Sequence, residues 1–337
     1  MKIGVPLVAV IILFLLAYVG VGVMGLHAVF GIVVPYIAIA VFLIGVVARV
    51  LGWARVPVPF RIPTTCGQEK SLPWIRQNKL DCPYTTWQVI GRMALEILFF
   101  RSLFRNTRTE LHKTEGGPRV AYASAKWLWL FGLLFHYSFL VIFVRHLRFF
   151  TEPVPGFITF LENVDGFFQV GVPVFYATTV IFLAAVGYLF LRRVVSTQMR
   201  YISLANDFFP LFLLLGIGIT GFFLRHLTKT DIVGVKELGL GLLSFSPSAP
   251  ESVDPLFYGH LFLVSVLFLY FPFSKLTHMF GVFMSPTRNL ANNNRAVRHV
   301  NPWNAPVKVH TYAEYVEEFG DKMRQVDIPI EPIPGKE

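Results

Sequence analysis

Residues 134–147 read L-F-H-Y-S-F-L-V-I-F-V-R-H-L, an apolar run that contains two histidines, His136 and His146. Polar side chains are costly inside a membrane-length apolar segment, and they are retained there where they pair with one another or serve a function. The two histidines lie ten residues apart, which is about 15 Å along a helix. The run therefore predicts a buried helix that presents two imidazoles at two different depths.

The composition of the whole chain indicates the environment of this run. Of its 337 residues, 54% are hydrophobic and 15% are charged, and 34 are phenylalanine. A soluble protein of this length would need a more polar surface, so the composition favours a membrane protein. The net charge of +10 does not indicate nucleic-acid binding, because the basic residues lie between apolar segments and not on a polar domain with aromatic platforms.

Six apolar runs are long enough to cross a bilayer, which takes about 20 residues. They are residues 5–25, 29–50, 126–148, 170–191, 206–227 and 256–284. These runs predict an all-α, polytopic membrane protein with six transmembrane helices, the last four of which form a bundle over residues 126–284. A second apolar run follows the first almost at once, so residues 1–50 are interpreted as a helical hairpin and not as a signal peptide.

The basic residues predict the orientation of the chain in the cell membrane. Residues 49–126 hold 13 lysines and arginines and residues 285–337 hold seven, whereas residues 149–169 hold none. Lysine and arginine are enriched in cytoplasmic loops. We therefore expect both termini and residues 51–125 in the cytoplasm, and the connections 149–169 and 228–255 outside.

The two long cytoplasmic segments carry further expectations. Residues 88–105 alternate apolar groups with arginines, which predicts an amphipathic helix on the anionic inner leaflet. The tail, residues 285–337, is polar and largely non-helical, with one short predicted helix over 311–324. Such a tail is expected to be loosely ordered or wrapped on a partner subunit.

Cys66 and Cys82 lie 16 residues apart in the first of these segments. In the cytoplasm, free thiols are expected for them. Two cysteines without a CxxC pair do not close a zinc or iron–sulfur site by themselves.

Four histidines on two of the predicted helices form a candidate cofactor frame. They are His136 and His146 on the third helix, and His260 and His278 on the sixth. Since 18 residues make five helical turns, His260 and His278 are expected on one face, with Pro272 kinking the helix between them. The two helices run in opposite directions. His136 is therefore level with His278 near the inside, and His146 is level with His260 near the outside.

Two facing imidazoles at each of two depths are what two bis-histidine haem b groups need. Helix bundles bind cofactors through side chains on facing helices. A flat macrocycle also needs small residues beside its ligands, and three glycines are candidates: Gly132, Gly259 and Gly281. The sequence thus predicts an inner haem iron between His136 and His278, and an outer haem iron between His146 and His260.

The spacings of ten and 18 residues resemble those of the gamma-type cytochrome b subunit of respiratory nitrate reductase, over residues 126–284. In that family four histidines ligate two haems stacked across the membrane, and the resemblance implies the same pairing. The stretch RIPTTCGQEKSLPWIRQNKLDCPYTTWQV, residues 61–89, differs from that subunit. Together with the six-span layout and the polar tail, it resembles the M-type membrane cytochrome b of the Dsr complex, which is linked to dissimilatory sulfite reductase.

This second resemblance covers nearly the whole chain and implies a function in dissimilatory sulfur metabolism. It implies exchange of electrons with menaquinone in the membrane and with a cytoplasmic heterodisulfide-reductase-like iron–sulfur subunit, the K subunit. It also implies a triheme cytochrome c, an iron–sulfur subunit and a second quinone-interacting membrane subunit, called J, O and P. Electrons are then expected to pass across the membrane between the two haems.

Charged and titratable residues near the predicted haems are candidates for supporting roles. His226, at the outer end of the fifth helix, is a candidate quinone contact, an interfacial polar residue or, in place of His260, a ligand of the outer haem. Arg145 and Arg225 are expected to neutralise haem propionates or to anchor their helices at the interface. Lys275 is the candidate for the propionate role at the inner haem.

Other classes of function stay open at this point. A proton-coupled transporter would use the histidines as a relay, but the chain shows only a weak internal repeat, R-H-L at 145–147 and at 225–227. A haem-free anchor would only hold partner subunits. A nitrate reductase gamma-like or heterodisulfide-reductase-linked cytochrome b of another respiratory complex is a further alternative. Zinc is disfavoured, because the spans hold no ligand pair at i,i+3 or i,i+4.

Overall fold

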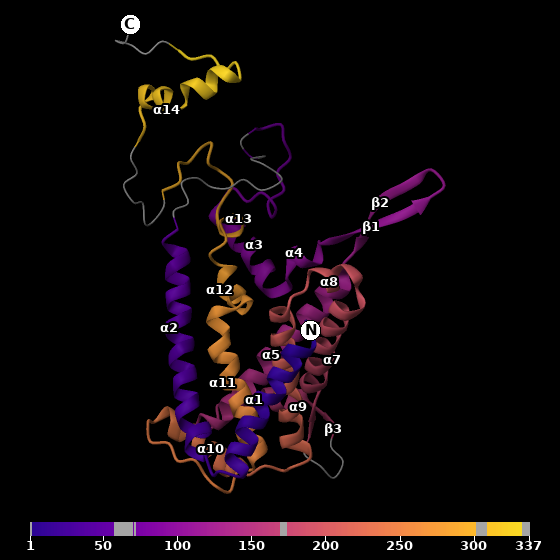
Figure 1. The fold of residues 1–337 in the computed structure, drawn as a ribbon, viewed down its shortest axis with the longest axis vertical. Coiled ribbons are helices and arrows are strands. Elements are labelled where there is room, and N and C mark those ends of the chain that lie inside the picture. Colours follow the sequence, from indigo (N-terminus) through magenta and orange to yellow (C-terminus); the bar gives the residue numbers. More distant parts are fainter. Residues whose placement is uncertain (1, 57–69, 71, 169–173, 301–308, 332–337) are drawn as a thin grey trace.

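The structure, a computed structural model, describes residues 2–56, 70, 72–168, 174–300 and 309–331. Within these ranges, six helices are long and apolar enough to cross a membrane. They are α1 (Gly4–Gly22), α2 (Val34–Ala54) preceded by η1 (Val29–Val33), α5 (Lys126–His146) continued by η3 (Leu147–Phe149), α7 (Ala177–Val195), α9 (Ala205–His226), and α11 (Pro255–Tyr270) continued by η4 (Phe271–Phe273). The prediction of an all-α, multi-pass membrane protein is confirmed (Figure 1).

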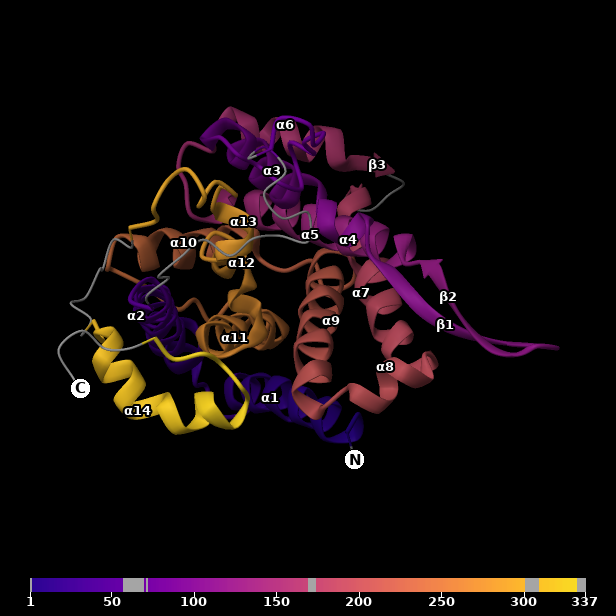
Figure 2. The same ribbon diagram turned by 90° about the horizontal axis from the view of Figure 1, so that it is seen from above.

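The four predicted core helices form one continuous bundle. α5 packs on α7, α7 packs on α9, and α9 packs on α11, while α1 and α2 flank α11 (Figure 2). Buried aromatic and aliphatic side chains fill the contact between α9 and α11, including Phe208, Leu213 and Leu263. The N-terminal hairpin therefore extends the bundle on the α11 side.

The two ends of the bundle carry different short elements. α3 (Thr86–Phe99), α4 (Arg101–Phe104), α8 (Thr197–Ile202) and α13 (Pro286–Asn289) lie at one end, whereas α6 (Gly156–Asp165) and α10 (Ile232–Leu243) belong to connections at the other (Figure 1). We call these the α3 end and the α10 end. Nζ of Lys2 donates to the carbonyl of Tyr201, 3.3 Å away in α8, so the N-terminus lies at the α3 end.

The last predicted span is not one helix. Three short helices follow α11: η4, η5 (Lys275–Thr277) and α12 (His278–Gly281). Pro272 has no amide hydrogen to continue the helix, and α11 ends just before it, at Tyr270. The kink predicted at Pro272 is a full interruption of the helix, because α11 ends at Tyr270 and Ser274 is extended. The count of five turns does not apply across this break, but His260 and His278 still both face α5.

The fourth span also begins later than predicted. β3 (Gly166–Phe168) pairs with β4 (Phe175–Tyr176), and α7 starts only at Ala177. The predicted span began at residue 170, but residues 175 and 176 belong to β4 and not to the helix. Residues 170–173 lie outside the described part. The helices α6 and α10 were not predicted either. On α6, three exposed apolar side chains recur at helical spacing, Phe157, Phe160 and Val164.

The predicted amphipathic helix over 88–105 is two helices. Thr85 caps α3: its hydroxyl accepts from the amide of Gln88, while the Gln88 side chain accepts from the amide of Thr85. Phe100 has a φ of 51°, in the left-handed region, and this residue ends α3 and begins α4. Left-handed backbone is rare for a bulky residue, so the bend here is held by surrounding contacts.

A β-hairpin that the sequence analysis did not predict follows α4. β1 (Thr107–Thr114) pairs with β2 (Gly117–Ser124), and the hairpin projects away from the bundle (Figure 1). Leu111, Val120 and Tyr122 lie on one face by register, and each is at least 61% exposed. The tail contains α14 (Tyr312–Gln325), which matches the helix predicted over 311–324.

Gly259 serves helix packing and not the accommodation of a macrocycle. A Cβ on Gly259 would lie 2.6 Å from Cε2 of Phe14 in α1. Small residues let membrane helices approach closely, and here the approach is filled by an aromatic ring. The expectation that this glycine makes room for a cofactor is therefore wrong.

We expect Gly259→Ala to destabilise the bundle by about 1–3 kcal/mol, because Phe14 must move out of its packed position. Gly187→Ala in α7 is the matched control, since a Cβ there meets nothing within 4 Å. The control should be neutral or gain up to about 1 kcal/mol from better helix propensity. Thermal unfolding in detergent measures both, and equal effects of the two variants would contradict the packing role.

Candidate cofactor site

The structure brings the four membrane histidines together as two pairs. The ring centres of His136 and His278 are 5.9 Å apart, and those of His146 and His260 are 6.5 Å apart. The pair His136/His278 lies nearer the α3 end, and we call it the inner pair. The pair His146/His260 lies nearer the α10 end, and we call it the outer pair.

The spacing within each pair fits one metal ion held between two imidazoles. A metal–imidazole bond is about 2.0 Å long, so two rings on opposite sides of one ion have centres roughly 6 Å apart. Two ligands do not complete a metal site, and no group of three or more His, Cys, Asp and Glu side chains occurs in the part of the chain that the structure describes. A haem needs only such axial ligands from the protein, because the porphyrin supplies the other four.

Both histidines of α5 hold their rings with their own helix. Nδ1 of His136 donates to the carbonyl of Gly132 at 2.7 Å, and Nδ1 of His146 donates to the carbonyl of Ile142 at 2.7 Å. Donation from Nδ1 leaves Nε2 with a lone pair in the neutral ring. That is the state a metal ligand requires, and the hydrogen bond also fixes the ring orientation.

The two partners across the bundle are held in the same way. Nδ1 of His278 donates to the carbonyl of Lys275 at 2.8 Å. Nδ1 of His260 donates to the hydroxyl of Thr220 at 2.8 Å, and Thr220 gives its own proton to the carbonyl of Gly216 at 2.7 Å. All four Nε2 atoms are thus left as acceptors.

Two residues of α9 belong to this site and were missed by the sequence analysis. Thr220 orients His260, and Gly221 lies against it, since a Cβ on Gly221 would be 3.2 Å from Cε1 of His260. Both are small residues on the fifth predicted span, at the outer depth. No spacing within one helix marks them, because their role depends on the packing of α9 against α11.

Arg145 and Arg225 both lie against the ring of one tyrosine. Their guanidinium carbons are 3.6 Å and 4.3 Å from the ring centre of Tyr176. Nε of Arg145 lies 3.2 Å from Oδ2 of Asp165, and these two side chains are only 8% and 5% exposed. Nε of Arg225 donates to the carbonyl of Val174 at 3.0 Å. Arg145 therefore has a carboxylate within the protein, and contact of either arginine with a propionate stays a prediction.

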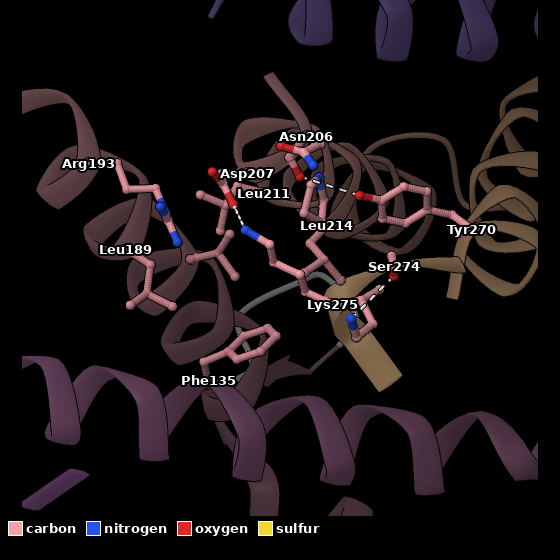
Figure 3. A pocket seen from close by; sticks show the side chains of 13 residues that line it. Phe135, Leu189, Arg193, Asn206, Asp207, Leu211, Leu214, Tyr270, Ser274 and Lys275 are labelled. Carbon is pink, nitrogen blue, oxygen red and sulfur yellow. Dashed lines mark hydrogen bonds and ion pairs between the residues drawn. The ribbon is translucent and has the colours of Figure 1, made fainter. Parts of the chain in front are cut away.

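Lys275 also has a carboxylate partner. A cavity of about 160 Å³ lies beside the inner pair, between α7, α9 and η5, and the ammonium of Lys275 reaches across it to Asp207 (Figure 3). Nζ of Lys275 is 2.6 Å from Oδ1 of Asp207. Sites for whole small molecules occupy about 300–1,000 Å³, so the cavity itself is too small for one. The propionate role of Lys275 stays a prediction.

His226 lies among aromatic rings and not beside His146. Its ring stacks on Phe175 at 4.1 Å and 7°, and lies 4.7 Å from the ring of Phe222. Its Nδ1 is buried without a hydrogen-bond partner. The structure thus gives His146 the partner His260, and it leaves His226 with an unused polar atom at the α10 end. Quinone contact by His226 stays a prediction.

Cys82 is buried at 1% exposure between α3 and the tail. The side-chain amide nitrogen of Asn292 lies 3.6 Å from Sγ of Cys82, and the backbone amide of Asn292 donates to the carbonyl of Pro83. Cys82 therefore helps to hold the loop before α3 on the segment after α13. Cys66 lies outside the described residues.

Six membrane-length helices with two facing histidine pairs at two depths define a polytopic membrane protein of the kind that binds cofactors inside a helix bundle. Within that class, the chain belongs to the nitrate reductase gamma subunit family, whose sequence model matches residues 84–299. Two relatives are similar over most of their length. Each is named "Hdr-like menaquinol oxidoreductase cytochrome b-like subunit".

The relative from Archaeoglobus fulgidus is 48% identical over 299 residues, which cover 87% of this chain and 88% of the relative. The relative from Archaeoglobus profundus is 43% identical over 276 residues, which cover 80% of this chain and 81% of the relative. The resemblance to the gamma-type subunit is thereby confirmed. The narrower resemblance to the M-type subunit of the Dsr complex stays a prediction.

Proposed function

We propose that this chain is a dihaem cytochrome b subunit of a quinone-linked membrane oxidoreductase. One observation carries the proposal: at each of two depths two imidazoles face each other, and each of the four rings makes a hydrogen bond to the protein through Nδ1. His136 and His278 would hold the inner haem iron, and His146 and His260 the outer one. Both relatives bear the name of a menaquinol oxidoreductase cytochrome b-like subunit, which supports the class.

The chain would orient the four ligand rings, bury the two haem sites and connect them through one helix. Each haem b, when bound, supplies one-electron redox chemistry. α5 carries one ligand of each pair, so a single rigid helix sets the distance between the two sites. Thr220 and the backbone carbonyls hold the rings, and the apolar helix faces exclude water.

The orientation proposed from the basic residues places the α3 end in the cytoplasm. The outer pair then lies toward the external surface, together with His226 and the paired arginines. We place menaquinol contact at this end, with His226 as the candidate that donates or accepts a proton through its unused Nδ1. The α3 end would face the heterodisulfide-reductase-like iron–sulfur subunit, and the J, O and P subunits of a Dsr-type complex would complete the assembly in dissimilatory sulfur metabolism.

Purified protein is expected to show the redox difference spectrum of a low-spin b-type cytochrome, with about two haems per chain by pyridine haemochrome assay. The reason is that each imidazole pair provides both axial ligands of one iron. Protein that folds and assembles without haem would overturn the proposal and leave the anchor or the transporter in its place. A single haem per chain would refute the dihaem part alone.

A further inference from the structure

A cluster of charged residues lies at the α3 end, the end nearer the inner histidine pair. Its members are Arg92, Glu96, Arg101 and Arg105 of the α3–α4 segment, Asp81 of the preceding loop and Arg288 of α13. We call this set the arginine cluster. The sequence analysis assigned its α3–α4 arginines to the lipid surface.

The α3–α4 segment, which carries three arginines of the cluster, contacts the inner pair through Phe100. The ring of Phe100, at the junction of α3 and α4, meets the ring of His136 edge-on at 4.9 Å. Two residues of α5 hold this junction, since Nε1 of Trp129 donates to the carbonyl of Phe99 at 2.7 Å and the hydroxyl of Tyr137 donates to the carbonyl of Leu98 at 2.9 Å. The junction of α3 and α4 therefore lies against His136, and two arginines of the cluster lie on the two helices that meet there.

The carboxylates of the cluster already have partners. Nη1 of Arg101 lies 2.7 Å from Oδ1 of Asp81, and Nη1 of Arg105 binds the same oxygen. The hydrogen bond from Arg101 is the main reason that the pKa of Asp81 falls to about 2.

Glu96, the second carboxylate, is shared in the same way. It accepts from the amide and hydroxyl of Ser102 at 3.0 Å and 2.7 Å, and Nη1 of Arg288 lies 3.8 Å away. Three arginines thus use both carboxylates of the cluster.

Arg92 is the arginine that is left over. It is 6% exposed, and its Nη1 is buried without a hydrogen-bond partner. Burial and the nearby Arg288 lower the pKa of Arg92, while the carboxylates of Asp81 and Glu96 act in the opposite direction. A buried charge without a counter-ion strongly destabilises a folded protein. With four arginines and two carboxylates, the described cluster has an excess of two positive charges.

A water molecule would accept a hydrogen bond from Arg92 but would not neutralise its charge. Oδ1 of Asn289 and Oδ1 of Asn293 in the adjoining segment are also buried without donors. These are neutral acceptors, and a buried water molecule satisfies such groups. A guanidinium in a site of low polarity needs a negative charge as well as a hydrogen bond.

We infer that Arg92 binds a propionate carboxylate of the haem held by His136 and His278, with Arg288 beside it. This inference rests on the proposed function. Haem b carries two carboxylates, which match the excess of two charges and which are costly in hydrocarbon. Lys275, the candidate from the sequence, already binds Asp207, whereas Arg92 is buried and makes no ion pair with a carboxylate among the described residues. Arg92 is thus a positioning and cofactor-binding residue for the inner haem.

The test is a redox titration of the two haems in Arg92→Gln. Reduction adds a negative charge to the haem, so loss of a neighbouring positive charge lowers its midpoint potential. The midpoint of the inner haem is expected to fall while that of the outer haem stays. The His278→Leu variant assigns the two midpoints. Arg92→Lys keeps the charge and should restore most of the inner midpoint.

Arg119→Gln is the matched control, because it removes the same charge from an exposed position at the same end of the protein. It should leave both midpoints unchanged. If Arg92→Gln does not accumulate, Arg288→Gln at the edge of the cluster takes its place, with a smaller fall in the inner midpoint expected. An infrared redox difference spectrum with haem labelled at the propionate carboxyls supplies a second readout, since the labelled band should shift in Arg92→Gln.

Two results would overturn the inference. One is an unchanged inner midpoint and an unchanged propionate band in variants that retain both haems. The other is a fall that occurs in vesicles containing phosphatidylglycerol and is absent in vesicles of phosphatidylcholine alone, which would make a lipid phosphate the partner. Wild-type protein without haem would instead refute the proposed function, so the two failures are distinguishable.

Discussion

The variant His278→Leu is expected to lose one haem and keep the other, so that the haem content falls from about two per chain to about one. Leucine offers no nitrogen to an axial position, and His136 alone does not hold a low-spin iron. The outer pair should survive, because His260 lies on α11, which ends at Tyr270, whereas His278 begins the separate helix α12. Electron transfer across the membrane should be lost with the inner haem.

Three measurements check this expectation. Pyridine haemochrome assay gives the haem content, redox titration shows whether one midpoint disappears, and quinol-driven reduction shows whether the remaining haem is still reached. His310→Leu, in the exposed part of the tail, is the control for histidine loss as such. Retention of both haems by His278→Leu would refute the pairing. The mirror variant His260→Leu should remove the other midpoint.

The variant Asp165→Ala should destabilise the protein by about 3–5 kcal/mol, because it leaves the buried guanidinium of Arg145 without its counter-charge. The cost is increased by Thr178, whose amide and hydroxyl donate to the same carboxylate at 2.8 Å and 2.6 Å. Thermal unfolding in detergent should show a large fall in the midpoint temperature. Asp165 joins α6 and α7 through these contacts, so the α10 end should loosen first.

A matched exposed ion pair provides the control for this second variant. Asp321 pairs with Arg324 at 2.7 Å, but Asp321 is 92% exposed, so Asp321→Ala should cost less than about 1 kcal/mol. The double variant Asp165→Ala/Arg145→Met should recover part of the stability, since it removes the uncompensated charge. Equal midpoints for the two single variants would contradict the buried role of Asp165.

The membrane spans were predictable because one physical requirement sets them. A segment in hydrocarbon must satisfy its own backbone hydrogen bonds, so about 20 apolar residues form a helix whatever lies beside it. The exceptions occur where local chemistry interrupts the run. Pro272 ends α11, and the pairing of β3 with β4 delays α7 until Ala177. Hydropathy counts apolar residues in both places and does not detect the change of conformation.

The meeting of His136 with His278 and of His146 with His260 followed from counting along two antiparallel helices. The predicted pairing is correct in spite of the break after Tyr270, because α12 holds His278 at the depth of His136. Thr220 and Gly221 did not follow from any count. They act on His260 from a third helix, and the contact between α9 and α11 is set by many side chains together.

The sequence by itself determined the spans and the depths of the four histidines, because both depend on distance along a helix. The tertiary structure decided which charges are paired: Arg145 with Asp165, Lys275 with Asp207, and Arg92 in no ion pair among the described residues. The physical reason is that a charge in a membrane protein is neutralised by whatever group packing brings within a few ångströms. Those groups come from separate helices and loops, and spacing along the chain does not encode their approach.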